Sequence, residues 1–496
     1  MNRKKKLLLN SCTGILKQVI TIICGFILPR YMLLYYGSAV NGVVSSITNY
    51  LSFISLLDMG VGAVVQANLY KPLAESDNDK ISSIVISSER FFRRLAYIFI
   101  GYIFVLCFIF PVFVNDSFSP YFSVSLLVII SISTFVQYFF GMTYQLLLNA
   151  DQKSYVPLSI QIVTILLNTV FAIILMKLGA SVHMVKLMTT IVYILRPIGQ
   201  FIYVNNHYKI NRKIKVIGEP IKQKWNGFSQ HLAAVICQNI DVVVLTLFAP
   251  LELVSVYSVY FIVTNGVEQI VLTAATGLES LFGNMIVKGE KDTLSRTFNA
   301  VEWIVHAGVT IIFSITGICI VPFVSVYTRG ITDANYIQPL FGALMVIAYG
   351  SQCLRVPYFR VIKAAGHFKE TQNGAYISAG LNIVITVVLV LKMGLVGAAI
   401  GTLVAMLYHT LYFVWYLRKN ILSRPIRFFV KHILIDVAVV LISCIGSSMF
   451  SFTGESYLLW ILYALIIAAI VIVVSVSINL IAFKGQIKEA IKLIMK

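Results

Sequence analysis

The chain has 496 residues, of which 58% are hydrophobic and only 12% are charged. Soluble domains carry about 25% charged residues, so the composition excludes a soluble enzyme, a disordered chain and a soluble nucleic-acid-binding protein. The net charge of +19 must therefore belong to a membrane protein, and no nucleic-acid partner is expected.

Apolar segments of membrane-spanning length recur along the whole chain. A transmembrane helix needs about 20 apolar residues, and the segments 117–150 and 456–483 contain no Asp, Glu, Lys or Arg. We predict an all-α polytopic membrane protein with about fourteen transmembrane helices. In chain order, their expected centres are 15–36, 44–66, 95–114, 122–147, 156–176, 184–204, 228–249, 253–277, 300–321, 340–358, 374–391, 395–417, 428–449 and 458–482.

Lysine and arginine are concentrated on one side of this helix plan. Basic clusters at 3–6, 90–94, 209–224 and 418–431 all fall on the side that holds the N-terminus. Cytoplasmic loops of membrane proteins carry an excess of Lys and Arg. We therefore predict that both termini are cytoplasmic and that the basic loops contact membrane lipids.

The two halves of the chain resemble each other at an offset of 215 residues, which relates Ala150 to Ala365 and 177–179 to 392–394. Because six helices separate equivalent positions, the repeat is parallel, about an axis along the membrane normal. We predict two six-helix lobes in parallel repeat plus two C-terminal helices. The expected ranges are 1–215 for the N-terminal lobe, 216–427 for the C-terminal lobe, and 428–496 for helices 13 and 14 with a cytoplasmic amphipathic tail.

Ionisable side chains also occur inside the predicted spans, where each costs about 2.5–3.5 kcal/mol on insertion scales. Arg30, Asp58, Asp241 and Glu268 fall in the first two helices of each lobe. This shared placement favours a central cavity, and hydrogen bonding between packed helices is the alternative.

Uncharged polar side chains accompany these charges. Ser45, Thr48, Ser52 and Ser55 recur three or four residues apart and share one helical face, with Asn49 beside them. Helices 7 and 8 carry comparable stripes. We predict substrate-binding roles for Arg30, Asn49, Ser52, Asn239, Asn265 and Gln269, and ion-coupling or charge-balancing roles for Asp58, Asp241 and Glu268.

The loops are too short to hold a catalytic domain. The largest cytoplasmic loop runs from about 205 to 225, and the sequence lacks a phosphate-binding loop ending in Gly-Lys-Ser/Thr. The seven Cys and seven His residues are scattered, without the spacing of a disulfide framework or a metal site. We predict a transporter rather than an enzyme, without a metal or cofactor, and the choice between Na⁺ and H⁺ as coupling cation stays open.

Several short sequences identify a resemblance that covers the whole chain. They are Leu28-Pro29-Arg30-Tyr31 before Gly37, Leu57-Asp58-Met59-Gly60-Val61-Gly62, Asn239-Ile240-Asp241 before Val256-Tyr257-Ser258, and Pro322-Phe323 through Tyr327-Thr328-Arg329-Gly330 to Asn335-Tyr336. With these sequences in this order and a 6+6+2 helix plan, the chain resembles the Wzx-type oligosaccharide flippases. These belong to the polysaccharide transport family, within the multidrug/oligosaccharidyl-lipid/polysaccharide exporter superfamily. Family members often carry Glu at the position of Asp58.

The resemblance implies a flippase of the bacterial cytoplasmic membrane that works by alternating access. Its substrate would be an undecaprenyl-diphosphate-linked oligosaccharide repeat unit, moved to the outer leaflet for capsule, exopolysaccharide or O-antigen assembly. A polysaccharide polymerase and the chain-length machinery are the implied protein partners. Arg30 suits the diphosphate because a guanidinium donates paired hydrogen bonds to phosphate oxygens, and an ion pair with Asp58 or Asp241 is the alternative.

Three other functions compete with this one. A multidrug cation antiporter and a lipid II flippase belong to the same superfamily. A membrane-embedded polymerase or glycosyltransferase is the enzymatic alternative, disfavoured by the short loops.

Overall fold

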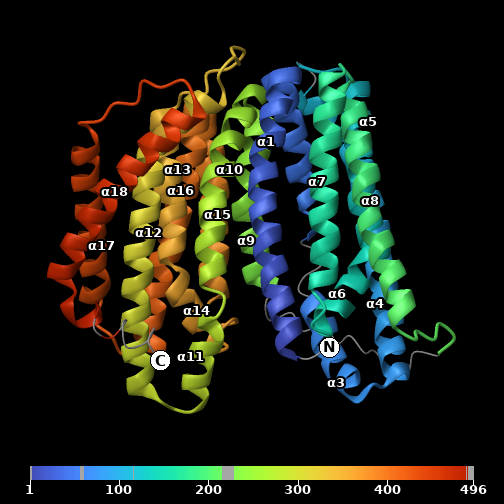
Figure 1. Ribbon diagram of the computed structural model, residues 1–496, viewed down its shortest axis with the longest axis horizontal. Helices are drawn as coiled ribbons and strands as arrows, with labels where there is room; N and C mark the ends of the chain where they lie inside the picture. Colours follow the sequence, from blue (N-terminus) through green and yellow to red (C-terminus); the bar gives the residue numbers. More distant parts are fainter. Residues whose placement is uncertain (1–2, 56–60, 115–116, 215–227, 488, 490–496) are drawn as a thin grey trace. The chain divides into compact units, whose positions relative to one another are not determined.

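The computed structural model describes residues 3–55, 61–114, 117–214, 228–487 and 489. In these residues the chain is helical and contains no strand (Figure 1). Twelve helices of this described part are long and apolar enough to cross a membrane, and a shorter apolar helix runs over Leu232–Phe248. The prediction of an all-α, multi-pass membrane protein is confirmed.

The helices follow one another with short connections. In chain order they are α1 (Arg3–Ser52), α3 (Val61–Glu75), α4 (Asn78–Val114), α5 (Pro120–Val136), the π-helical turn η1 (Gln137–Gly141), α6 (Met142–Ala150), α7 (Tyr155–Lys177), α8 (Val182–His207), α9 (Phe228–Phe248), α10 (Leu251–Ala274), α11 (Leu278–Val287), α12 (Lys291–Tyr327), α13 (Pro339–Leu354), α14 (Val356–Ala364), α15 (Gln372–Met393), α16 (Leu395–Asn420), α17 (Arg427–Ser447) and α18 (Tyr457–Ala482).

The first predicted span and the start of the second lie in α1, which is broken at Gly37. A straight helix of 50 residues would be about 75 Å long, far more than the hydrocarbon core of a bilayer. Gly37 has φ 81° and ψ 176°, a conformation that glycine adopts readily and other residues only with strain. The chain therefore turns at the glycine that the sequence places between the two spans.

Several predicted helices are divided in the structure. The span expected at 44–66 ends as helix α1 at Ser52, and α3 begins at Val61; Asp58 lies outside the described residues. The span expected at 122–147 contains the π-helical turn η1 between α5 and α6. The span expected at 340–358 divides between α13 and α14, where Pro357 stands in the first turn of α14 and has no N–H to continue the preceding helix.

The helices form two compact units. The N-terminal unit comprises residues 1–235 with 250–255, and the C-terminal unit comprises 236–249 with 256–496. In the N-terminal unit, α7 contacts α1 and α8, and α5 contacts α4 and α8 (Figure 1). In the C-terminal unit, α16 contacts α13 and α15, while α17 and α18 contact each other and α12.

The order of elements repeats from one unit to the other. Helices α4 and α12 each have 37 residues and begin at Asn78 and Lys291. Helices α8 and α16 each have 26 residues and begin at Val182 and Leu395. In each unit a helix divided in two, α5–α6 or α13–α14, follows the long helix. The structural repeat thus has nearly the offset found in the sequence.

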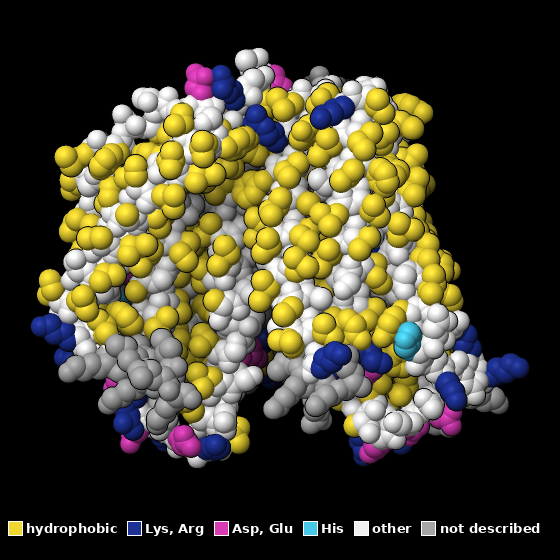
Figure 2. Space-filling model, in the orientation of Figure 1, with side chains coloured by type: hydrophobic (Ala, Val, Ile, Leu, Met, Phe, Trp, Pro, Cys, Tyr) yellow, Lys and Arg dark blue, Asp and Glu magenta, His cyan; other side chains and the backbone are white. Residues whose placement is uncertain are grey.

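Hydrophobic side chains cover the helix surfaces. On the face that Figure 2 shows, they occupy the middle of each unit, whereas charged side chains lie toward the ends of the helices. Large apolar residues such as Phe108 and Leu465 are 67% and 61% exposed. A bilayer supplies the apolar surroundings that such surfaces require.

Glycines bring α16 close to α15 inside the C-terminal unit. A Cβ atom at position 397 would lie 2.6 Å from the backbone nitrogen of Val390, and one at position 401 would lie 2.8 Å from that of Thr386. Small residues let transmembrane helices approach in this way. Because Gly397 and Gly401 have no side chains, the two helices pack closely, which brings their polar side chains within reach of one another.

Candidate functional site

The N-terminal unit contains a polar cavity of about 580 Å³. We call it the N-unit cavity. Its walls come from α1 and the residues just after it, and from α5, η1, α7 and α8. The lining side chains are Leu28, Thr48, Leu51, Ser52, Ile54, Ser55, Ile130, Ser133, Thr134, Gln137, Tyr138, Asn168, Lys186, Thr189, Thr190, Tyr193 and Arg196.

Part of the serine and threonine stripe of the second span faces this cavity. Thr48, Ser52 and Ser55 line it, whereas Asn49 and Arg30 are not among its lining residues. Asn49 instead donates a hydrogen bond to the carbonyl of Ser45 at 2.9 Å. Of the substrate-binding residues expected in this unit, the structure thus places Ser52 in the cavity wall.

Two cations of α8 also line the cavity. The Nε atom of Arg196 donates to Thr164 Oγ1 at 2.8 Å, and its guanidinium carbon lies 3.8 Å from the centre of the Tyr193 ring. No ion pair between described residues involves Lys186 or Arg196. The described part of the wall therefore presents positive charge without a compensating carboxylate.

The sequence contains a signal for this cationic face. Lys186 lies in the span expected at 184–204 and is not among the expected substrate-binding residues, and α8 begins at Val182. Lys186, Thr189, Thr190 and Tyr193 recur at helical spacing and therefore share one face. That periodicity, continued to Arg196, is sufficient to predict that the residues line one surface.

Two amide groups of the cavity wall have unpaired oxygens. Gln137, in the π-helical turn, donates to Gln145 Oε1 at 3.3 Å, and Asn168 donates to the hydroxyl of Tyr193 at 3.4 Å. Their own oxygens, Gln137 Oε1 and Asn168 Oδ1, are buried without a hydrogen-bond partner in the described structure. A buried acceptor left unpaired costs about 1–3 kcal/mol, so both atoms favour a ligand that brings hydroxyl or N–H donors.

A second polar centre surrounds Asp241 in the C-terminal unit. Asp241 is 1% exposed and accepts hydrogen bonds from Tyr257 at 2.9 Å, from Thr402, and from Thr386 at 3.4 Å. Thr386 also lies 3.2 Å from Asn382 Oδ1. Four helices, α9, α10, α15 and α16, thus place a carboxylate among hydroxyl and amide oxygens. Hard cations bind oxygen ligands of this kind.

Glu268 lies in a neighbouring part of the same unit. It is 1% exposed and accepts a hydrogen bond from the Gln352 amide. Arg355 donates to His409 Nδ1 at 2.9 Å. Asn265 and Gln269 are half-buried on the same helix as Glu268, and in the described part of the chain neither side chain has a hydrogen bond. Asn239 is half-buried on α9, two residues before Asp241.

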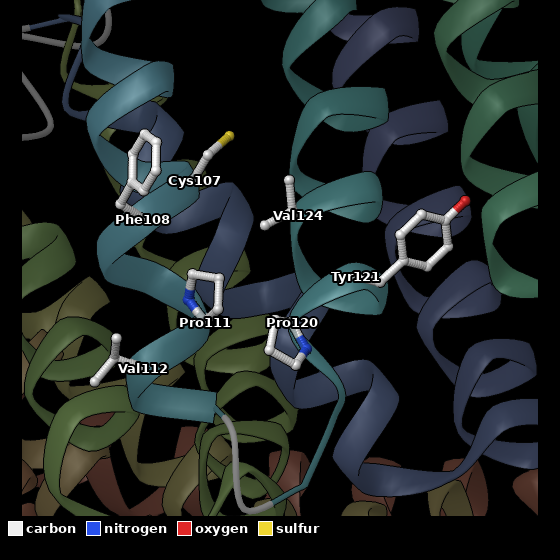
Figure 3. A pocket seen from close by; sticks show the side chains of 7 residues that line it. All are labelled: Cys107, Phe108, Pro111, Val112, Pro120, Tyr121 and Val124. Atoms are coloured by element: carbon white, nitrogen blue, oxygen red, sulfur yellow. The ribbon is translucent and has the colours of Figure 1, made fainter.

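An apolar groove of about 590 Å³ lies between the end of α4 and the start of α5 (Figure 3). Its side chains are Cys107, Phe108, Pro111, Val112, Pro120, Tyr121 and Val124. Phe108, Val112 and Tyr121 are 67%, 72% and 84% exposed. This exposed, uncharged groove suits hydrocarbon, in contrast to the N-unit cavity.

Comparison with known proteins identifies the fold. No protein-family model matches the sequence, and no curated protein matches it. Among solved structures, the lipid II flippase MurJ in an inward closed conformation is similar with a TM-score of 0.65 at 16% identity, over 97% of this chain and 100% of that one.

Two MATE transporters have the same fold. An inward-facing MATE-family multidrug resistance transporter of the MOP superfamily is similar with a TM-score of 0.55 at 12% identity, over 82% of this chain and 95% of that one. A eukaryotic MATE transporter is similar with a TM-score of 0.54 at 14% identity, over 82% of this chain and 97% of that one. The chain therefore has the MurJ and MATE fold, and these solved proteins are a flippase and transporters rather than enzymes.

Proposed function

We propose that the protein is a flippase that moves an undecaprenyl-diphosphate-linked oligosaccharide repeat unit from the inner to the outer leaflet by alternating access. One observation carries this proposal: Lys186 and Arg196 line a cavity without a carboxylate partner in the described residues, together with the unpaired oxygens of Gln137 and Asn168.

The chemistry of that cavity matches the two parts of the head group. Ammonium and guanidinium groups bind phosphate oxygens strongly, and amide oxygens accept hydrogen bonds from sugar hydroxyls. A diphosphate and its sugars cannot cross hydrocarbon unaided because their polar groups would lose all hydrogen bonds. We propose that Lys186 and Arg196 hold the diphosphate while the polyprenyl tail stays in the bilayer.

The size of the cavity limits what it holds. Ligand pockets of about 300–1,000 Å³ enclose a drug-sized molecule, and the N-unit cavity has about 580 Å³. It therefore suits the diphosphate with the adjoining sugars rather than a long glycan. Arg30 does not line the cavity and is proposed as a further phosphate ligand because of its guanidinium chemistry. Asn49, Asn239, Asn265 and Gln269 are proposed as sugar ligands.

The carboxylates are proposed to serve ion coupling or charge balance. Asp241 has an oxygen-rich, buried surrounding that suits Na⁺ or a proton, and Glu268 lies in the same unit. Asp58 is assigned to this role from the sequence, because it lies outside the described residues. Substitution Asp241→Asn should remove the dependence of transport on the ion gradient while the membrane potential still contributes about 2.3 kcal/mol per charge per 100 mV.

The cation-lined cavity favours a flippase over a multidrug cation antiporter. A multidrug cation antiporter needs an acidic surface for its substrate, and Lys186 and Arg196 would repel a cation. A lipid II flippase would use the same diphosphate chemistry. Deletion separates these two flippases: loss of a lipid II flippase is lethal, whereas loss of an oligosaccharide flippase removes surface polysaccharide.

The location follows from two earlier predictions. The resemblance implies that the protein lies in the bacterial cytoplasmic membrane, and the distribution of Lys and Arg predicts that both termini are cytoplasmic. Its product would pass to a polysaccharide polymerase and the chain-length machinery for capsule, exopolysaccharide or O-antigen assembly.

The test is complementation of a deletion strain with single variants. Lys186→Gln and Arg196→Gln should each reduce surface polysaccharide at least tenfold and cause lipid-linked oligosaccharide to accumulate, with normal amounts of protein in the membrane. Lys177→Gln is the matched control, because Lys177 is exposed at the end of α7. Export at the wild-type level in both cavity variants would contradict the proposal.

A further inference from the structure

A cluster of Glu89, Tyr144 and Arg212 occurs in the N-terminal unit near the start of α4, where Arg93 of the same helix also lies 3.7 Å from Glu89 Oε2. The Tyr144 hydroxyl donates to Glu89 Oε1 at 2.8 Å. Arg212 Nη2 donates to the Tyr144 hydroxyl at 2.9 Å, and Arg212 Nη1 lies 3.4 Å from Glu89 Oε2. The cluster joins α4, α6 and the segment that follows α8.

The same three residue types form a cluster in the C-terminal unit. The Tyr358 hydroxyl donates to Glu302 Oε1. Arg424 Nη1 donates to the same oxygen at 2.6 Å, and Arg424 Nη2 binds the other carboxylate oxygen. This cluster joins α12, α14 and the segment that follows α16.

Equivalent residues occupy equivalent places in their elements. Glu89 and Glu302 are each the twelfth residue of a 37-residue helix. Tyr144 and Tyr358 are each the third residue of a nine-residue helix. Each Arg lies within five residues of the end of the last helix of its repeat. Three elements far apart in sequence contribute to each cluster, so independent origins would require three coincidences.

We infer that the two clusters are copies of one clasp, and that the N-terminal copy is the one that can open. Each clasp binds the segment that follows a six-helix repeat to two helices of that repeat. These helices are α4 and α6 in the N-terminal unit and α12 and α14 in the C-terminal unit. Arg212 belongs to the segment that leads to the C-terminal unit. The inference goes beyond the proposed function, and its test does not depend on transport.

The two copies differ in burial. The side chains of Arg212 and Glu89 are 51% and 11% exposed, whereas those of Arg424 and Glu302 are 12% and 0% exposed. His432 of α17 also lies 3.3 Å from Glu302 Oε2, so an appended helix helps to enclose the C-terminal copy. Exposed ion pairs are weak and screened by salt, while buried pairs are screened much less.

A second contact secures the segment at the N-terminal clasp. The backbone N–H of Asn211 donates to Ser82 Oγ at 3.0 Å, on the same helix α4 that carries Glu89. This contact is uncharged, so it does not confer salt sensitivity. Release of Arg212 would leave the segment held by this bond and by the contacts of Tyr208 nearer to α8.

Limited trypsin digestion of the full-length protein in detergent tests the inference. Trypsin cleaves after Lys209, Arg212 and Lys213, and cleavage after the exposed Lys288 in the turn before α12 is the internal reference. Raising NaCl from 50 to 500 mM should increase cleavage at 209–213 about fivefold relative to Lys288. Sites flanking the C-terminal clasp, Lys419 and Arg427, should show no such increase.

Two variants weaken the N-terminal clasp without altering a cleavage site. Glu89→Gln should raise cleavage at 209–213 about fivefold at 50 mM NaCl and abolish the salt dependence. Tyr144→Phe leaves the ion pair between Glu89 and Arg212 in place, so it should raise cleavage at 50 mM NaCl and keep the salt dependence. Glu75→Gln is the matched control, because its exposed pair with Lys71 lies outside the clasp. The wild-type salt response needs no substitution, so it tests the inference even if a variant fails to fold.

Two results would overturn the inference. The first is wild-type cleavage at 209–213 that does not change with salt relative to cleavage after Lys288. The second is a Glu75→Gln variant that behaves like Glu89→Gln, since the effect would then follow overall charge rather than the clasp.

Discussion

Replacement of Gly401 by alanine tests whether close packing of α15 on α16 builds the Asp241 centre. A Cβ atom at position 401 would lie 2.8 Å from the backbone nitrogen of Thr386 and 2.9 Å from its Cα atom. The Thr386 hydroxyl, which donates to Asp241, is also in the path of the new methyl group. The substitution therefore disturbs the helix contact and the carboxylate together.

The magnitude follows from the size of the overlap. Carbon atoms are best separated by about 3.5–4.0 Å, so the two helices must move apart by about 0.5–1 Å. Overpacking of this kind costs about 1–3 kcal/mol, and loss of the Thr386 hydrogen bond adds about 1 kcal/mol. Replacing a helical glycine by alanine in itself stabilises the helix by about 0.5–1 kcal/mol. Taken together, these contributions should lower the free energy of unfolding by about 1–3 kcal/mol.

The assay is the thermal unfolding midpoint of the purified protein in detergent. Gly380→Ala is the matched control, because Gly380 lies on α15 and a Cβ atom there would meet nothing within 4 Å. Its midpoint should equal or exceed that of the wild type, whereas the midpoint of Gly401→Ala should fall below both. A Gly401→Ala midpoint at or above that of Gly380→Ala would refute the packing argument.

Three further substitutions have defined outcomes. Gly37→Ala should lower the unfolding free energy by about 1–3 kcal/mol, because Gly37 has φ 81°; an unchanged thermal midpoint would contradict this. Thr402→Val, which removes a donor from Asp241 with little change in shape, should destabilise by about 1–3 kcal/mol, and a stability equal to wild type would show that the carboxylate does not need this bond. Burial raises the pKa of Asp151, in the turn between α6 and α7, but hydrogen bonds from Lys153, Tyr208 and Lys6 outweigh it and hold the pKa below the ordinary value of 3.8. Because the folded-state pKa is lowered, the stability from this group is present above about pH 3.8 and is lost as the pH falls through the folded-state pKa. Asp151→Asn should therefore lower the thermal midpoint at pH 7, and the difference from wild type should shrink below pH 4; a difference that grows in acid would contradict the assignment.

Much of the fold follows from hydropathy alone. Apolar runs such as 456–483 contain no charge, and α18 occupies the expected place. Interruptions within spans cannot be predicted from hydropathy, because a π-helical turn such as η1 changes the backbone hydrogen bonds without changing the hydrophobicity of the segment. The break between α13 and α14 could have been expected at Pro357, which cannot donate a backbone hydrogen bond.

The sites are harder to predict than the helices. Asp241 is conspicuous in the sequence as a charge inside a span, but its donors Thr386 and Thr402 lie on helices more than a hundred residues away. Only the packed structure brings them together. Lys186 lies near the start of the span expected at 184–204, and the position of its side chain depends on the rotation of α8 against its neighbours.

Ligand binding to the N-unit cavity tests the central claim most directly. The measurement is native mass spectrometry of the purified protein with an undecaprenyl-diphosphate-linked sugar, with tetraphenylphosphonium as the competing cation. Wild type and Lys177→Gln should bind the diphosphate lipid, and the double variant Lys186→Gln, Arg196→Gln should bind it at least a hundredfold more weakly, since two charge-assisted hydrogen bonds contribute about 1.5–3 kcal/mol each. Equal binding by the double variant, or binding of tetraphenylphosphonium in place of the diphosphate lipid, would contradict the account.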